Sequence, residues 1–322
     1  MVLESIIGEK NIQKHPVFIL FLTILICIGS IVFANLLFPK YASVLSVAFI
    51  TIGLAPLVFN VLSKEEADEV LSKRSCTTFL LRHFNIIMIY VWIFVGIIIA
   101  YALFYSLSAP IERTSLFNEQ ISAFCAISGD CKDGVPYSIS GKATAMGLSA
   151  CMSENSSIES CTLFIFENNA GVLLFTILLS LLYGVGAIFI IAWNASILGV
   201  FFGETFINFS HVKWIGMFQS MLIGHGPPEL LGYVFGALAG AILSSMVAKG
   251  QLLTHDAEVI LKDVFFLSAL AFFSVGYGAV TEAVGIMKMG ELYFLMGFLY
   301  LFVIIVALFL YNSTRPSPKF CL

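Results

Sequence analysis

Three ionisable side chains lie in or beside long apolar stretches, and their types and spacing could do chemistry: His225, Glu229 and Glu282. An ionisable group within an apolar helix is costly to bury and is therefore a functional candidate by default. Two close carboxylates in a low dielectric cannot both ionise cheaply, so one would hold a proton or both would share a cation. The simpler interpretation of Glu229 is helix capping, since a carboxylate in a first turn interacts favourably with the helix dipole.

Amide side chains extend this polar set. Asn194 interrupts a long apolar run, and buried amides are expensive without hydrogen-bond partners. We predict one polar network near the inner half of a membrane, made of Asn194, His225, Glu229 and Glu282. A second polar group opens another apolar stretch and is predicted to lie farther away, on the outer side: Glu167, Asn168 and Asn169.

Catalytic motifs are missing from the sequence. It contains no His-Glu-x-x-His pair, no nucleotide-binding glycine-rich loop, no Cys-x-x-Cys and no serine nucleophile motif. One histidine with two carboxylates is a weak metal signal, so we predict no metal, no cofactor and no enzymatic activity. The net charge is −4 and no basic block occurs, which argues against a nucleic-acid partner.

The elements that must position these residues are membrane spans. Of the 322 residues, 59% are hydrophobic and 11% are charged, against about 25% charged in a soluble domain. A span needs about 20 apolar residues, and spanning backbone must satisfy its own hydrogen bonds as helix. The sequence therefore predicts an all-α polytopic transmembrane helical bundle. Seven stretches qualify or nearly qualify as spans: 17–38, 41–62, 84–108, 170–192, 230–247, 264–281 and 292–311.

One apolar stretch is too long for a single crossing. No charged residue occurs from Asn168 to Gly203, which as one helix would measure about 54 Å. We therefore expect a break near Asn194 and a re-entrant segment over 194–228. The following span carries a stripe of small residues at four-residue spacing, which is typical of close helix packing: Gly232, Gly236 and Gly240.

Four cysteines lie in the long loop between the third and fourth spans: Cys125, Cys131, Cys151 and Cys161. Four cysteines in one loop favour two disulfides in an oxidising compartment, with three connectivities open. Free thiols or metal ligation are the alternatives. The loop also contains Asn155-Ser-Ser, a glycosylation acceptor pattern. We therefore place this small domain outside the cell membrane and the N-terminus in the cytoplasm.

The predicted organisation has four parts. Residues 1–108 form a three-span region with a cytoplasmic amphipathic loop at 63–83, which opens on a capping-box pattern. Residues 109–169 form the extracytoplasmic cysteine loop, 170–311 the membrane core, and 312–322 a tail.

Three segments resemble the stage II sporulation protein M family. They are Phe166-Glu-Asn-Asn leading to Asn194-Ala-Ser-Ile-Leu-Gly, then His225-Gly-Pro-Pro-Glu-Leu with its glycine-rich helix, then Ala279-Val-Thr-Glu-Ala-Val. The likeness covers about 166–286, and the first three spans are similar to archaeal-type members. It implies a multi-pass protein without hydrolase activity, and the bacterial namesake anchors peptidoglycan-degrading partners. The four-cysteine loop and the span after Glu282 depart from the family. The matching polar positions are Asn169, Asn194, His225, Glu229 and Glu282.

Two functions follow from these features. The first is a non-enzymatic scaffold or assembly factor of the cell envelope, with protein partners or a second copy in addition to membrane lipid. The second is a transporter, channel or lipid-handling protein that uses the intramembrane carboxylate and histidine site. A lined cavity at the polar residues would favour transport, and a dry, paired cluster would favour a scaffold.

Overall fold

The computed structural model describes residues 16–71, 79–128, 151, 157–207, 224–250, 257–286 and 290–314. The described residues form helices and contain no strand, which confirms the all-α prediction. The elements in chain order are α3 (Pro16–Leu37), η1 (Pro39–Tyr41), α4 (Ala42–Leu71), α5 (Phe79–Leu107), α6 (Pro110–Leu116), α7 (Asn118–Ser128), α9 (Ile158–Tyr183), α10 (Ala187–Ile207), α12 (Gly226–Ala248), α13 (Ala257–Ile286) and α14 (Gly290–Thr314).

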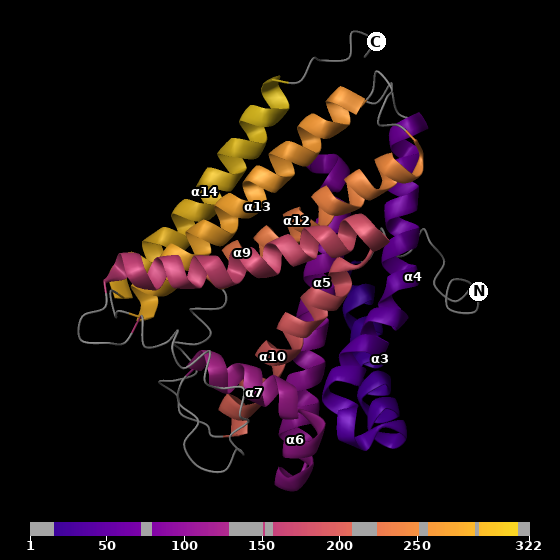
Figure 1. Cartoon of the computed structure of the whole chain (residues 1–322), viewed down its shortest axis with the longest axis vertical. Coiled ribbons are helices and arrows are strands. Elements are labelled where there is room, and N and C mark those ends of the chain that lie inside the picture. The colour runs from indigo at the N-terminus through magenta and orange to yellow at the C-terminus, as the bar shows by residue number, and fades with distance from the viewer. Residues whose placement is uncertain are drawn as a thin grey trace.

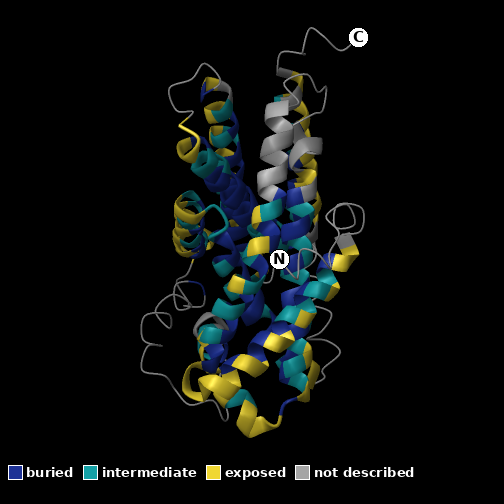
Figure 2. Ribbon diagram, turned by 90° about the vertical axis from the view of Figure 1, so that its right-hand side faces the viewer, coloured by how far each residue is buried: buried dark blue, intermediate teal, exposed yellow. Residues whose placement is uncertain are grey.

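Seven of the described helices are long and apolar enough to cross a membrane, and α14 adds the shorter apolar stretch Leu295–Tyr311. Exposed apolar side chains cover their outer surfaces, among them Phe21, Leu25 and Phe302. Figure 2 shows buried residues gathered on the inward faces of the helices, with exposed residues on the outside. The chain is therefore a multi-pass membrane protein.

The first group of helices is formed by α3, α4, α5 and α10. In Figure 1 α3, α4 and α5 run along the long axis of the molecule. Glycines permit close approach between α5 and α10: a Cβ on Gly199 would lie 2.5 Å from Tyr101 Cβ and 2.9 Å from Ile98 O. Lipid tails supply no hydrophobic force between helices, so such van der Waals packing holds the group together.

The second group is formed by α9, α12, α13 and α14. In Figure 1 α9 runs across the long axis, and one end of α9 lies near the ends of α13 and α14 at the left. The glycine stripe of α12 allows close approach of two neighbouring helices. A Cβ on Gly232 would lie 2.8 Å from Val275 Cγ2 of α13, and a Cβ on Gly240 would lie 2.6 Å from Ile177 O of α9.

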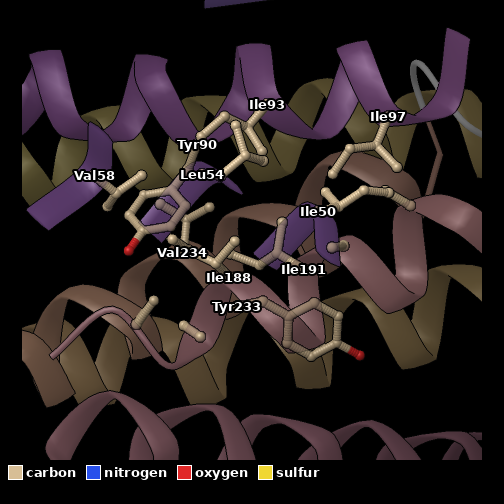
Figure 3. Close-up of a cluster of buried hydrophobic side chains, with 14 of the residues drawn as sticks. Ile50, Leu54, Val58, Tyr90, Ile93, Ile97, Ile188, Ile191, Tyr233 and Val234 are labelled. Atoms are coloured by element: carbon tan, nitrogen blue, oxygen red, sulfur yellow. The ribbon is translucent and has the colours of Figure 1, made fainter. Parts of the chain in front are cut away.

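A shared core joins the two groups. In Figure 3, side chains of α4 (Leu54), α5 (Tyr90, Ile93), α10 (Ile191) and α12 (Val234) meet in one cluster. All five are essentially inaccessible to solvent. The polar residues of α12 are thereby held in a fixed position relative to the first group of helices.

The predicted break near Asn194 is wrong. Helix α9 ends at Tyr183, Gly184 has φ 67°, and α10 begins at Ala187, so Asn194 lies inside a continuous helix. The tight turn uses Gly184 as C-cap, because the left-handed region is open to glycine at little cost. The predicted re-entrant segment at 194–228 is therefore helix α10 up to Ile207. Residues 208–223 lie outside the described part of the chain.

Other predicted boundaries also move. Helix α4 continues through Ser63 to Leu71, so the capping-box pattern there does not begin a helix. Its strong helix formers, Lys64, Glu65, Glu66 and Ala67, extend α4 instead. Helix α13 passes beyond Glu282 to Ile286. Helix α9 begins at Ile158, so the cysteine loop is shorter than the predicted 109–169 and contains α6 and α7.

Candidate functional site

Glu229 stands in the first turn of α12, where the sequence predicts a helix start. His225 is the residue before the helix, proline occupies its first positions, and the Glu229 N–H donates to His225 O at 3.1 Å. Proline suits this position because the first N–H groups of a helix have no intrahelical acceptor. The His225 side chain makes no capping hydrogen bond. The turn thus fixes Glu229 at the end of α12 that lies beside α13 and α9.

Three helices meet at the Glu229 carboxyl group. Asn169 Nδ2 of α9 donates to Glu229 Oε1 at 2.9 Å. The Glu282 carboxyl of α13 lies close enough to the Glu229 carboxyl for the two groups to interact electrostatically. Asn168 Nδ2 donates in turn to Asn169 Oδ1 at 3.2 Å. We name these residues the carboxyl cluster: Asn168, Asn169, Glu229 and Glu282.

Helix α13 packs closely against one side of the Glu229 side chain. A Cβ on Gly278 of α13 would lie 2.9 Å from Glu229 Cγ and 3.5 Å from Pro228 Cβ. Glu282 follows Gly278 by one helical turn, so both residues lie on the face that meets α12. Tyr233, one turn beyond Glu229 on α12, is buried close to both carboxyl groups. A glycine at 278 therefore allows the two acidic residues to meet.

The predicted network is wrong in its amide members. Asn194 Nδ2 donates to Ile190 O in its own helix at 2.8 Å, and no hydrogen bond among the described residues joins it to Glu229 or Glu282. Asn169, predicted to lie farther away, is buried and bonded to Glu229. The reason is the longer α9, which places Asn169 near the middle of a helix instead of at its start. Glu167 is exposed on α9.

The cluster lies at the same end of α13 as the cysteine loop. A disulfide joins Cys151 and Cys161, and the two residues form one buried cluster with Ile165 of α9 and with Ala279 and Ala283 of α13. These alanines flank Glu282 along the helix. The sequence predicted the cysteine loop on the outer side and the polar network in the inner half of the membrane, so their predicted placement relative to each other is wrong. The reason is that α10 is long enough to be a further span, where a re-entrant segment was predicted. One more crossing before α12 reverses the side on which Glu229 is expected.

Some predicted residues lie beyond the described part of the chain. They are Cys131, Asn155 and the side chain of Cys125. The Cys151–Cys161 pair is one of the connectivities that the sequence left open. Across the described residues, no three His, Cys, Asp or Glu side chains gather into a group that could hold a metal ion.

No family model, no curated protein and no solved structure matches this chain. The resemblance to the stage II sporulation protein M family accordingly depends on its three sequence segments alone.

A second polar unit was missed from the sequence. Tyr105 of α5 donates its hydroxyl to Glu204 of α10 at 2.7 Å. The Arg113 guanidinium lies over the Tyr105 ring at 5.3 Å and donates to Tyr105 O, Ser106 O and Ser108 O. In the sequence, Glu204 follows the uncharged stretch directly and Arg113 lies just after a span. These two positions could have predicted charged groups near the membrane interface.

This second unit fixes the start of the cysteine loop. Arg113 satisfies carbonyl groups at the end of α5 that have no intrahelical donor. Phe117, between α6 and α7, is buried against the rings of Tyr101, Phe104 and Tyr105. Gln120 Nε2 of α7 donates to Ser43 O of α4 at 2.9 Å. Helices α6 and α7 are thus anchored to the membrane helices.

Proposed function

We propose that this protein is a non-enzymatic membrane scaffold or assembly factor of the cell envelope. The observation that carries the proposal is the attachment of the cysteine loop at both of its ends. Its first part is anchored through Arg113, Phe117 and Gln120, and its last part through the Cys151–Cys161 disulfide on α13. The two described ends of the loop, α7 and the start of α9, are held in this way and offer a partner surfaces that need little ordering at binding.

The carboxyl cluster supports the same proposal. It joins α9, α12 and α13 through a buried amide and two carboxyl groups, beside the disulfide. The close fit of Glu229 against Gly278 is the packing expected of a structural staple. The sequence resemblance to a family of non-hydrolytic membrane anchors agrees with this interpretation.

Photo-crosslinking in native membranes tests the scaffold function. A photoreactive residue at Glu159, exposed at the start of α9, samples the cysteine loop, and one at Phe302, exposed on α14, samples lipid. We expect a discrete protein adduct from position 159 and lipid adducts from position 302. The protein adduct should weaken in the Cys161→Ser variant. Lipid or no adducts at position 159, in membranes where position 302 reacts, would contradict the proposal.

A second candidate is a proton-linked or cation-linked transporter. It is favoured by two neighbouring carboxyl groups, one of which accepts an amide hydrogen bond, because such a pair holds a proton or a cation readily. Its test is solute-driven proton uptake in proteoliposomes. Transport that the Glu282→Gln variant abolishes, while the variant still inserts and folds, would favour this candidate over the scaffold.

A further inference from the structure

One end of the molecule carries a belt of exposed apolar side chains next to the predicted extracytoplasmic domain. Figure 2 shows exposed residues concentrated at the lower end of the molecule, the end that carries α6 in Figure 1. Helix α6 lies against η1, the connection between α3 and α4. We name this belt the collar: Leu36, Leu37, Phe38, Tyr41, Leu107 and Ile111.

The collar continues the lipid-facing surface of the spans. Leu103, Leu107 and Ile111 follow at four-residue spacing from α5 into α6, and Leu107 and Ile111 are 85% and 82% exposed. Leu103 and Leu107 lie one turn apart on α5 and belong to the span Ile86–Leu107. Ile111 belongs to α6, which begins after the extended residue Ala109. Exposed aliphatic side chains therefore stand on both sides of the junction between α5 and α6.

The positive charge of α6 is turned toward the end of α5. Arg113 donates its hydrogen bonds to carbonyl groups at the end of α5, and Glu112 Oε2 accepts from Ala109 N–H at 3.1 Å. The opposite side of the segment is buried through Leu116 and Phe117. The short helix is thus held by Arg113, Leu116 and Phe117, and the Ile111 side chain is left outward.

Lys40 and Tyr41 stand at the level of η1 and have the chemistry of a membrane interface. Both are exposed, and the Lys40 ammonium lies 5.4 Å from the centroid of the Tyr41 ring. Tyrosine is enriched where hydrocarbon meets the headgroups, and a lysine there extends its charge to the phosphates. A domain that faces only water rarely exposes a large apolar patch, and such a patch marks an interaction surface.

We infer that α6 and the collar lie in the phospholipid leaflet, at the boundary between acyl chains and headgroups, so that α6 is an interfacial helix and not part of the water-exposed domain. The occupant of the collar is lipid. The exposed aliphatic side chains beside the span Ile86–Leu107, the inward-directed Arg113 and the Lys40–Tyr41 pair all favour lipid over a protein partner. This inference holds whether the protein is a scaffold or a transporter.

Depth-dependent fluorescence quenching tests the inference on the full chain in phosphatidylcholine vesicles. Trp92, Trp193 and Trp214 are first replaced by phenylalanine, and single tryptophans are then introduced by Ile111→Trp and Leu107→Trp. Two matched reference variants are Glu119→Trp, exposed on α7, and Phe302→Trp, exposed on the lipid face of α14. Circular dichroism of each variant establishes that its helices are retained.

We expect lipids brominated near the headgroup to quench the tryptophans of Ile111→Trp and Leu107→Trp at least as strongly as those of the two reference variants. Lipids brominated near the chain end should quench them less than Phe302→Trp. Quenching no stronger than that of Glu119→Trp would overturn the inference, because the collar would then face water. Blue-shifted emission without quenching would also overturn it, because protein would then cover the collar.

Discussion

The two asparagines, Asn169 and Asn194, provide the sharpest test of the carboxyl cluster. The sequence predicts Asn194 inside the polar network and Asn169 outside it, whereas the structure bonds Asn169 to Glu229 and Asn194 to its own helix. Replacing each with alanine removes the same amide group from an apolar helix. The difference between the two variants therefore isolates the contact between helices.

The expected magnitudes follow from the two environments. A hydrogen bond to a charged group contributes about 1.5–3 kcal/mol in soluble proteins, while hydrogen bonds between membrane helices average about 0.6 and reach about 1.7 kcal/mol. Asn169 is buried, and Asn169→Ala leaves Glu229 without this donor. We expect that variant to lose about 1–2 kcal/mol of unfolding free energy, roughly a 5–30-fold change in the folding equilibrium.

Asn194→Ala should change the unfolding free energy by less than about 0.5 kcal/mol. Its amide bonds the carbonyl of Ile190 one turn back, and that carbonyl retains its place in the helix ladder when the amide is removed. Alanine is also the better helix former, which offsets part of the loss. Asn194→Ala is thus the matched control for Asn169→Ala.

The assay is reversible unfolding in mixed micelles by titration with SDS, followed by tryptophan fluorescence. A double-mutant cycle of Asn169→Ala with Glu229→Leu, which removes the acceptor oxygen, measures the coupling between the two side chains directly. The reasoning is refuted if Asn194→Ala costs as much as Asn169→Ala. It is equally refuted by a coupling energy within the additivity error of about 0.3–0.5 kcal/mol.

Three further contrasts probe other contacts. Gly278→Ala should destabilise by about 1–3 kcal/mol because its Cβ would overlap the Glu229 side chain, whereas Gly276→Ala meets only ring atoms of Phe166 at 3.6 Å and should be tolerated; both are measured by the same titration. Cys161→Ser should weaken the loop attachment by about 2–4 kcal/mol and speed proteolysis near the start of α9, and unchanged cleavage would count against a structural disulfide. Arg113→Ala should cost about 1–3 kcal/mol by leaving helix-end carbonyls unpaired, whereas Lys262→Ala, which removes an exposed ion pair with Glu258, should cost under about 0.5 kcal/mol; equal losses would show that Arg113 is not an anchor.

The sequence was sufficient for most of the spans because their physical requirement is local. About 20 apolar residues must satisfy their own backbone in lipid, and six of the seven predicted stretches each correspond to one helix in the structure. The predicted stretch 170–192 is instead divided between α9 and α10. The proximity of Glu229 and Glu282 was also predictable. It requires only that α12 and α13 be antiparallel neighbours, and the short connection between them makes that arrangement the natural one.

The break between α9 and α10 was misplaced because a polar residue was given more weight than backbone geometry. Asn194 needs no break, since its amide bonds the carbonyl four residues earlier. The sequence feature that marks the break is Gly184-Val-Gly186. Gly184 has a positive φ and ends α9 just before α10 begins. Packing decides the remainder: a Cβ on Gly186 would lie 2.3 Å from Leu179 O, a contact that no sequence periodicity encodes.

These two outcomes have one origin. A contact between neighbouring helices depends on their local connection, so it can be predicted correctly even when an earlier part of the topology is wrong. The side of the membrane on which that contact lies depends on the number of spans that precede it, so one misplaced helix break reverses the predicted side. The Cys151–Cys161 disulfide is informative for this reason, because its packing on Ala279 and Ala283 ties the side of Glu282 to the cysteine loop directly, without counting spans. In a polytopic protein of this kind, an anchored loop fixes the side of a buried polar site more reliably than the number of helices before it.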